Sequence, residues 1–280
     1  MQRRVVSSWE LFSFPGFEAS FETLVGQAGH LTEEFPSTRL MDWNPYRARH
    51  PDLFLFPNDQ ADDRLKVYGN VFLLRRGDFM LLVDTGLGEL PPALNVTFVL
   101  PAGLKAAGIA LKEIDAVFLS HAHPDHIGWV SLNGQPTFPN AQYFLSNVDL
   151  EHLRTSDSDR FERLIQPLQT ARQLELLDGE TVLSHGLIVR PSPGHTPGHM
   201  TLQTPGLIIA SDVLHNPAQI SHPEWQSALD WNPELAVQSR KTLVRDALET
   251  GAVVCVTHMP SPGIGRVVQG FDGLPTWEAV

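Results

Sequence analysis

Short runs of apolar, β-prone residues recur along this chain of 280 residues, and glycine, proline or polar residues bound each run. Such runs predict buried strands. The predicted strands are 66–75 and 79–84 (joined as a hairpin by 76–78), 114–119, 142–145, 181–183 with 187–190, 200–203 with 206–210, and 252–256. Helical spacing predicts helices at 104–110, 147–154, 159–172 with an interruption at Pro167, and 233–250. Strands that alternate with helices in this way indicate an α/β fold.

The last of these helices has the clearest boundaries. Asn232 is a good N-cap, Pro233 suits the first helical position, and Glu234 places an acid in the first turn. Gly251 is expected to end the helix. The sequence therefore predicts one long helix that leads directly into the strand 252–256.

Residues 1–65 show no such periodicity and read as an irregular arm before a main domain at 66–280. Ten aromatic residues lie in this arm, and a disordered tail would be poor in them. The arm is therefore expected to pack on its own domain. The alternatives are a wall of the substrate pocket or the interface of a homodimer.

Composition narrows the classes of partner and compartment. A net charge of -12 and a pI of about 5.4 argue against nucleic acid and against an anionic membrane surface. Apolar runs stay short of the roughly 18 residues that a membrane span needs, and no apolar signal segment follows the basic start. The single cysteine, Cys255, forms no internal disulfide and reads as a core thiol, so a cytoplasmic location is expected.

The strand 114–119 is followed at once by an unusual concentration of metal-binding residue types. His121, His123, Asp125 and His126 lie within six positions, which a bland polar loop would rarely contain. His121 and His123 are two residues apart on extended chain and so point to the same side. Imidazoles and carboxylates are typical ligands of zinc and similar ions. The sequence therefore predicts a metal site at the end of this strand.

Three further predicted strand ends or turns present residues of the same kind. With the first motif they give seven candidate metal ligands: His121, His123, Asp125, His126, His195, Asp212 and His258. Seven groups are too many for one tetrahedral ion, so two divalent ions are expected, zinc first, with manganese, cobalt or iron as alternatives. We assign His121, His123 and His195 to one ion, and Asp125, His126 and His258 to the other. Asp212 and a hydroxide would bridge them, so no serine or cysteine nucleophile is needed.

The motif His-x-His-x-Asp-His, with the later His, Asp and His and with Asp84-Thr85-Gly86 upstream, resembles the metallo-β-lactamase superfamily. The resemblance covers residues 66–260. It implies a four-layer αβ/βα sandwich, in which helices flank two mixed sheets and the metal ions lie at one edge. It also implies that the seven residues keep the ligand roles given above.

Two stretches, 211–215 with 222–223 and 258–265, look closest to methyl parathion hydrolase and the quorum-quenching lactonases. Zinc β-lactamases of the commonest kind have a cysteine where this chain has Asp212, which argues against antibiotic hydrolysis. The acyl-homoserine lactonases have a tyrosine three residues after the bridging aspartate, where this chain has His215. His215 is therefore expected to line the pocket mouth and is a candidate catalytic residue beside Asp125 and Asp212.

The sequence thus predicts a dinuclear hydrolase in which a metal-bridging hydroxide attacks a lactone, ester or phosphotriester. An apolar ester-like small molecule suits the aromatic-rich arm, and no cluster of basic residues suggests a nucleotide. The alternative is a mononuclear iron oxidoreductase of the same fold, similar to the persulfide dioxygenases. Two roles stay open: Asp84 caps a turn or orients a metal-bound histidine, and His199 stabilises its turn or supports a ligand.

Overall fold

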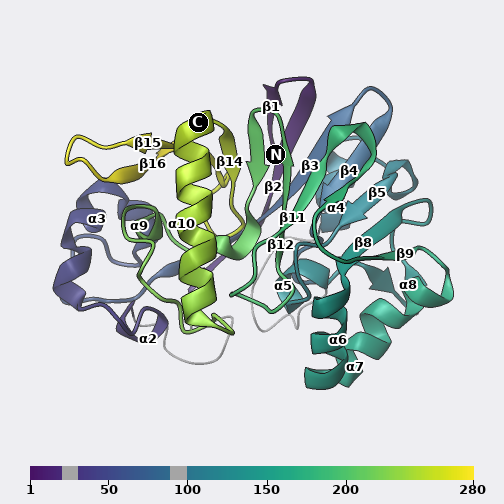
Figure 1. Ribbon diagram of the computed structural model, residues 1–280, viewed down its shortest axis with the longest axis horizontal. Helices are drawn as coiled ribbons and strands as arrows, with labels where there is room; N and C mark the ends of the chain where they lie inside the picture. Colours follow the sequence, from purple (N-terminus) through teal and green to yellow (C-terminus); the bar gives the residue numbers. More distant parts are fainter. Residues whose placement is uncertain (21–30, 89–99) are drawn as a thin grey trace.

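The computed structural model describes residues 1–20, 31–88 and 100–280. Its centre is a pair of seven-stranded sheets that lie face to face (Figure 1). The first sheet has the order β1-β2-β3-β4-β5-β8-β9, and the second has the order β10-β11-β12-β13-β14-β15-β16. Both are mixed, because β4, β5, β8 and β9 run parallel in the first, and β13 and β14 run parallel in the second.

The strands of the first sheet are β1 (Gln2–Val6), β2 (Trp9–Ser20), β3 (Lys66–Arg76), β4 (Phe79–Val83), β5 (Ala116–Phe118), β8 (Gln142–Ser146) and β9 (Leu174–Leu177). Those of the second are β10 (Thr181–Val182), β11 (Ile188–Pro191), β12 (Met200–Thr204), β13 (Leu207–Ile209), β14 (Val253–Cys255), β15 (Ile264–Gln269) and β16 (Pro275–Ala279). A separate small ribbon pairs β6 (Ser131–Leu132) with β7 (Gln135–Pro136).

The helices are α2 (Leu31–Glu34), α3 (Asn44–Arg49), α4 (Leu100–Ala106), α5 (Pro124–Ile127), α6 (Asn147–Ser156), α7 (Ser158–Arg160), α8 (Gln166–Thr170), α9 (Ala218–Ser221) and α10 (Pro233–Thr250). Short 3-10 turns are η1 (Leu40–Trp43), η2 (Pro51–Leu53), η4 (Leu111–Glu113), η6 (Ser184–Gly186) and η7 (Ser211–Val213), and η5 (Phe161–Ile165) is a π-helix. None of the helices that the structure describes is long and apolar enough to cross a membrane.

Strand β3 shows why the sheets stack in layers. Alternate side chains of a strand point to opposite faces of its sheet. Phe72 and Leu74 pack with Leu202 and Ile209 of the second sheet, which forms the core between the sheets. Val71 and Leu73 point the other way, into a second core against α4, α6 and α8.

The second sheet is covered on its outer face by α10. Ile208 and Val254 pack there against Leu243, Val244 and Ala247 of the helix. Helix, sheet, sheet and helix therefore form four layers, which confirms the predicted αβ/βα sandwich.

The prediction that residues 1–65 are irregular was wrong for residues 2–20. These residues form β1 and β2, and β2 pairs with β3 along the edge of the first sheet. The pattern was hidden because Pro15-Gly16 interrupts the apolar run, and the register of the pair shifts between Pro15 and Phe17. Strands β9, β15 and β16 were also missed, since their partners and buried faces are set by distant segments.

Residues 31–65 carry a cluster of their own beside α9 (Figure 1). Phe35, Trp43 and Phe54 are almost fully buried in it. Trp43 also packs against Trp225, whose ring centroid lies 5.0 Å away, and Ala218 of α9 completes the cluster. Much of the aromatic content of the N-terminal segment therefore lies packed against the second half of the chain. Phe21 and residues 89–99 of the predicted loop 87–100 lie outside the described residues.

Two predicted helices differ from the observed ones. The helix predicted at 104–110 begins earlier and ends at Ala106, because Gly108 takes a left-handed conformation with φ 74°. Pro167 was expected to interrupt the next helical stretch. Instead it lies in the first turn of α8, directly after the π-helix Phe161–Ile165, where its missing N–H costs no hydrogen bond.

Candidate metal centre

The parallel strands of each sheet place the candidate ligands at one edge of the molecule. His121 and His123 follow β5, and Pro124 then starts the short helix α5, which carries Asp125 and His126. In the second sheet, Asp212 follows β13 and His258 follows β14. Because these neighbouring strands end at the same edge, residues far apart in sequence converge there. His195 reaches the same place from the turn between β11 and β12.

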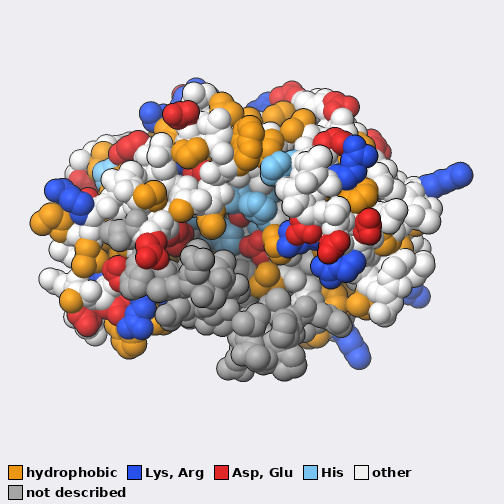
Figure 2. All heavy atoms as spheres, turned by 90° about the horizontal axis from the view of Figure 1, so that it is seen from below, with side chains coloured by type: hydrophobic (Ala, Val, Ile, Leu, Met, Phe, Trp, Pro, Cys, Tyr) orange, Lys and Arg blue, Asp and Glu red, His pale blue; other side chains and the backbone are white. Residues whose placement is uncertain are grey.

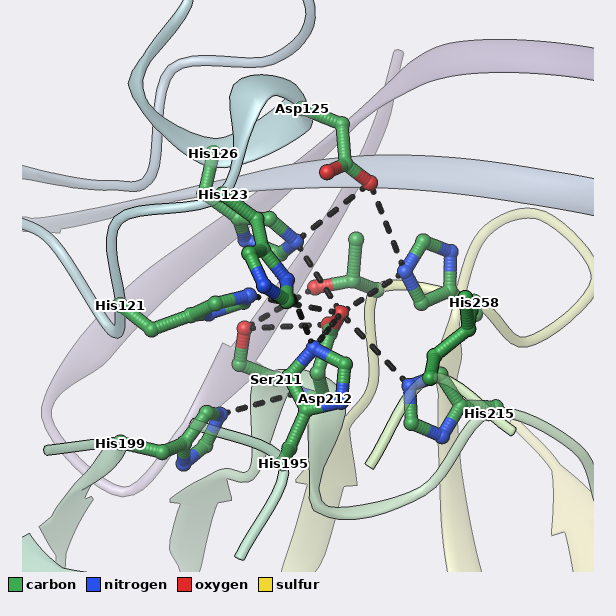
Figure 3. Close-up of polar contacts among 12 residues, drawn as sticks. His121, His123, Asp125, His126, His195, His199, Ser211, Asp212, His215 and His258 are labelled. Carbon is green, nitrogen blue, oxygen red and sulfur yellow. Dashed lines mark hydrogen bonds and ion pairs between the residues drawn. The ribbon is translucent and has the colours of Figure 1, made fainter. Parts of the chain in front are cut away.

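Figure 3 shows these side chains pointing toward a common centre. Their ligand atoms fall into two sets, each with all atoms within 4.8 Å of one another. One set is His121, His123 and His195, and the other is Asp125, His126, Asp212 and His258. All seven residues predicted from the sequence are therefore brought together. The two sets match the two assigned groups, except that Asp212, assigned as the bridge, falls in the second set. In Figure 2 the pale blue histidines lie in a hollow of the surface.

The carboxylate of Asp212 lies between the two sets. Its Oδ2 atom is 2.9 Å from His258 Nε2 and 3.2 Å from His126 Nε2 in the second set. The same oxygen is 3.5 Å from His195 Nε2 and 3.7 Å from His121 Nε2 in the first set. One oxygen within reach of imidazoles from both sets is the arrangement expected of a carboxylate shared by two cations.

The donor set fits divalent metal ions. His121 and His126 are fully buried, and their Nε2 atoms have no hydrogen-bond partner among the described residues. Buried nitrogens without a partner are rare in folded proteins, and a metal ion satisfies them. Imidazole and carboxylate together suit zinc and neighbouring transition metals.

The electrostatics of the site divide the histidines into two classes. Burial lowers the pKa of His123 to about 3, and the neighbouring His195 adds to the effect. Burial also opposes the charged form of His258, but Asp212 and Asp125 outweigh it and raise its pKa to about 9. The carboxylates therefore favour positive charge at the part of the site that His258 occupies. A metal ion that binds there displaces the protons that its histidine ligands would otherwise hold.

Asp84, at the end of β4, orients one of the candidate ligands. One of its oxygens, Oδ2, is 2.9 Å from His126 Nδ1 and also accepts hydrogen bonds from Ser120 Oγ and Ser211 Oγ. The other, Oδ1, accepts from the backbone N–H of Ser120. Of the two roles left open, the structure thus supports that of an orienting residue. Ser120 and Ser211 also belong to this network, which sequence analysis missed.

We expect Asp84→Asn to weaken metal binding by about 10- to 100-fold, which is typical when the hydrogen-bond partner of a metal-bound histidine is altered. Metal affinity would be measured by competition with a chromophoric chelator. Asp115→Asn is the matched control, since Asp115 is exposed at the opposite end of β5. Equal affinity of wild type and Asp84→Asn would contradict the orienting role.

Asp149 ties two of the ligand loops together. This buried residue in the first turn of α6 accepts hydrogen bonds from the backbone N–H groups of Ala122 and Gly198, at 2.7 and 3.0 Å. A side chain at Gly198 would lie 2.5 Å from the Asp149 nitrogen, so only glycine fits this approach. Asp149 thereby fixes the position of the loop that carries His121 and His123 relative to the loop that carries His195. In the sequence, the signal of this role was that Asp149 is an acid that closely follows the end of a predicted strand.

His199 and His215 lie beside the candidate ligands. His199 is fully buried, and its Nε2 accepts a hydrogen bond from the backbone N–H of Asp212 at 3.3 Å. The structure thus supports the view that His199 supports a ligand. His215 is stacked on His258, with ring centroids 5.5 Å apart, and lines a cavity together with His258. Burial, with a smaller contribution from His195, holds the pKa of His215 well below its usual value.

Asp230 lies behind His195 and was missed in the sequence. Its Oδ1 is 3.6 Å from His195 Nδ1, and its Oδ2 accepts a hydrogen bond from Arg240 Nη1 at 3.1 Å. Burial raises the pKa of Asp230, but the facing imidazoles of His195 and His215 and the Arg240 cation outweigh it and hold the value at about 2. The buried ion pair therefore faces the side of His195 turned away from Asp212.

Glu34, in α2, is a second acid that sequence analysis missed. It is 8% exposed and lines the same cavity as His215 and His258. Burial raises its pKa from 4.5 to about 7, although the nearby His258 opposes the shift. The folded protein therefore holds a proton on Glu34 over a pH range in which the unfolded chain has released it.

This proton gives the metal-free protein a pH-dependent stability. Between pH 4.5 and about 7 the folded state binds more protons at Glu34, so this contribution falls as pH rises and then levels off. We expect Glu34→Gln to be as stable as wild type near pH 4 and more stable at pH 8, by up to about 3 kcal/mol. Urea unfolding of the chelator-treated proteins at both pH values measures this. If wild type and Glu34→Gln differed in free energy of unfolding by the same amount at both pH values, the raised pKa of Glu34 would be contradicted.

Comparisons with known proteins place the chain in a family. The sequence profile of the metallo-beta-lactamase superfamily matches residues 65–258. This protein belongs to the metallo-beta-lactamase superfamily. The match spans both candidate ligand sets. The predicted resemblance is thereby confirmed.

Individual proteins similar to this chain share between 24% and 33% of its residues over the matched parts. The chain is 33% identical over 168 residues to the uncharacterized protein YobT of Bacillus subtilis, covering 54% of this chain and 71% of that one. It is 24% identical over 209 residues to an N-acyl homoserine lactonase of a Bacillus species, covering 67% and 79%. The structure of AidC, a dizinc quorum-quenching lactonase, has a TM-score of 0.76 at 24% identity and covers 100% of this chain and 97% of that one. This metallo-beta-lactamase-fold protein thus has the architecture of the lactonases.

Proposed function

We propose that this protein is a dinuclear metal-dependent hydrolase that cleaves a lactone, an ester or a phosphotriester. The observation that carries the proposal is the position of Asp212 Oδ2, within 3.7 Å of imidazole nitrogens from both ligand sets. A single-metal site has no need for such a shared carboxylate. The similar proteins that are described as lactonases support a small ester-like substrate. One of them is described as a dizinc enzyme, which supports a site for two ions.

The ions, when bound, supply a water of lowered pKa as nucleophile and polarise the bond under attack. The protein's own residues do the rest. His121, His123 and His195 would hold one ion, and Asp125, His126 and His258 the other, with Asp212 between them. Asp84 faces the Nδ1 atom of His126, and Asp230 faces the Nδ1 atom of His195, so that each carboxylate orients the imidazole in front of it. The site therefore needs no serine or cysteine nucleophile.

His215 is placed to contact the substrate. It lines the cavity beside His258, and neither of its ring nitrogens has a hydrogen-bond partner among the described residues. Its Nε2 lies 3.9 Å from Asp212 Oδ2, beside the ligand sets. We infer that His215, as a neutral imidazole, donates a hydrogen bond to the substrate oxygen. It would take the place of the phenol expected there in acyl-homoserine lactonases.

Metal analysis combined with activity screening tests the proposal. The purified protein should hold two equivalents of zinc, cobalt or manganese and hydrolyse at least one member of a panel of lactones, aryl esters and phosphotriesters. Chelation should abolish this activity, and adding the metal back should restore it. One equivalent of iron with oxygen uptake on persulfide substrates would overturn the proposal in favour of the oxidoreductase alternative.

A further inference from the structure

The cavity beside the ligand sets has polar groups in its lining that the proposed chemistry does not use, and Glu34 is one of them. Its walls include Leu65 and Val67 at the start of β3, Leu229, and the imidazoles of His215 and His258. Glu34, Lys66 and Asn216 complete the lining. A carboxyl group therefore faces a small cavity next to the candidate ligand His258.

The structure holds the backbone of Glu34 firmly. Its carbonyl oxygen accepts a hydrogen bond from the backbone N–H of Ala228 at 2.7 Å. On either side, Leu31 and Phe35 are fully buried in the aromatic cluster around Trp43. The Glu34 side chain is therefore presented to the cavity by packed structure on both sides.

One oxygen of the Glu34 side chain is buried with no hydrogen bond to compensate for its burial. Its Oε2 atom is buried without a hydrogen-bond partner among the residues that the structure describes. Leaving a buried polar atom unpaired costs about 1–3 kcal/mol, and more for a charged group. Such a group in a folded protein calls for an explanation, and at a cavity wall a ligand can provide the missing donor.

We infer that Glu34 is a specificity-determining residue whose carboxyl group accepts a hydrogen bond from a neutral O–H or N–H group of the substrate, close to the scissile carbonyl. This inference rests on the proposed hydrolase function. The donor lies close to the carbonyl because Glu34 shares its small cavity with His258 and His215. The donor group of the substrate is expected to be neutral, because metal ions bound at the neighbouring ligand sets would repel an ammonium group.

A matched series of lactones tests the inference. The series is γ-butyrolactone, its α-hydroxy derivative and its α-methoxy derivative, of which only the hydroxy compound offers a donor. Glu34→Leu should lower kcat/KM for the hydroxy lactone by about 10- to 100-fold, the effect of losing a hydrogen bond to an ionisable group. For the other two lactones the change should stay under about 3-fold. Glu34→Gln keeps an acceptor oxygen and should fall between wild type and Glu34→Leu.

Glu33→Gln is the control, because Glu33 is exposed on the same helix and should behave as wild type on all three lactones. Equal losses on the three lactones, or no loss on the hydroxy compound, would overturn the inference. If Glu34→Leu fails to fold, the test uses Glu34→Gln instead. The measure is again its loss of kcat/KM on the hydroxy lactone compared with its loss on the other two lactones.

A binding experiment separates this inference from the proposed function. If the wild type hydrolyses none of the three lactones, they are not its substrates, but the preference for a donor group can still be measured by binding. Calorimetric titration with 2-hydroxycyclopentanone and 2-methoxycyclopentanone, which have no ester bond, compares the same two groups. Tighter binding of the hydroxy compound that disappears in Glu34→Leu supports the inference, and equal binding of both compounds overturns it.

Discussion

Asp212→Ala should lose bound metal and hydrolytic activity together. The expected fall in kcat/KM is about 10³-fold or more, because the ions contribute several kcal/mol of transition-state stabilisation. The physical reason is the position of Oδ2, which reaches imidazoles of both ligand sets. In the proposed dinuclear site, removal of that oxygen would leave each set one donor short and would remove the negative charge that two cations share. Metal content by mass spectrometry and turnover on the best substrate of the panel are the measurements.

The matched control for Asp212→Ala is Glu249→Gln, which removes an exposed carboxylate from α10 and should leave metal content and rate unchanged. Circular dichroism would establish that both variants are folded. If Asp212→Ala kept two equivalents of metal and the full rate, the shared-carboxylate arrangement would have to be abandoned.

Arg240→Ala should be the most destabilising single change in α10. The side chains of Arg240 and Asp230 are both fully buried, with 3.1 Å between Nη1 and Oδ2. Removal of one partner of a buried ion pair leaves the other charge uncompensated, which typically costs about 3–5 kcal/mol. The free energy of unfolding in urea measures the loss. Arg245→Ala, on the same helix but exposed, should change it by less than about 0.5 kcal/mol.

The double variant Asp230→Leu with Arg240→Met separates the stability role of the pair from its role behind His195. Apolar residues of similar volume can replace a buried ion pair without a net cost, so most of the stability should return. Metal affinity should not return, because His195 Nδ1 still lacks its facing carboxylate. If the double variant regained full metal affinity, Asp230 would be only a partner of Arg240.

Much of the fold was predictable because local patterns suffice for strands buried on both faces. The hairpin β3–β4, the strand β5 and the helix α10 with its Asn232 cap and Gly251 end all appear where the pattern placed them. Strand β2 was missed because Pro15-Gly16 breaks its pattern, and pairing with β3 compensates for that break. Only a tertiary contact could make this segment a strand.

The residue types of the candidate site were predictable for a different reason. Histidines and aspartates directly after strand ends stand out in any sequence, and the chemistry of their side chains identifies a metal site. His121, His126 and Asp212 could be named in this way. Glu34 and Asp230 could not, because an isolated acid gives no local sign that it will be buried beside a histidine.

The sequence alone determined the strands with a clear local pattern, such as β5 and β14, and which donor atoms follow their ends. The tertiary structure alone decided that one oxygen of Asp212 lies among imidazoles from both sheets, and that Glu34 faces the cavity beside them. The physical reason is distance along the chain. Contacts between residues separated by dozens of positions depend on how two sheets pack, and local spacing carries no record of that packing.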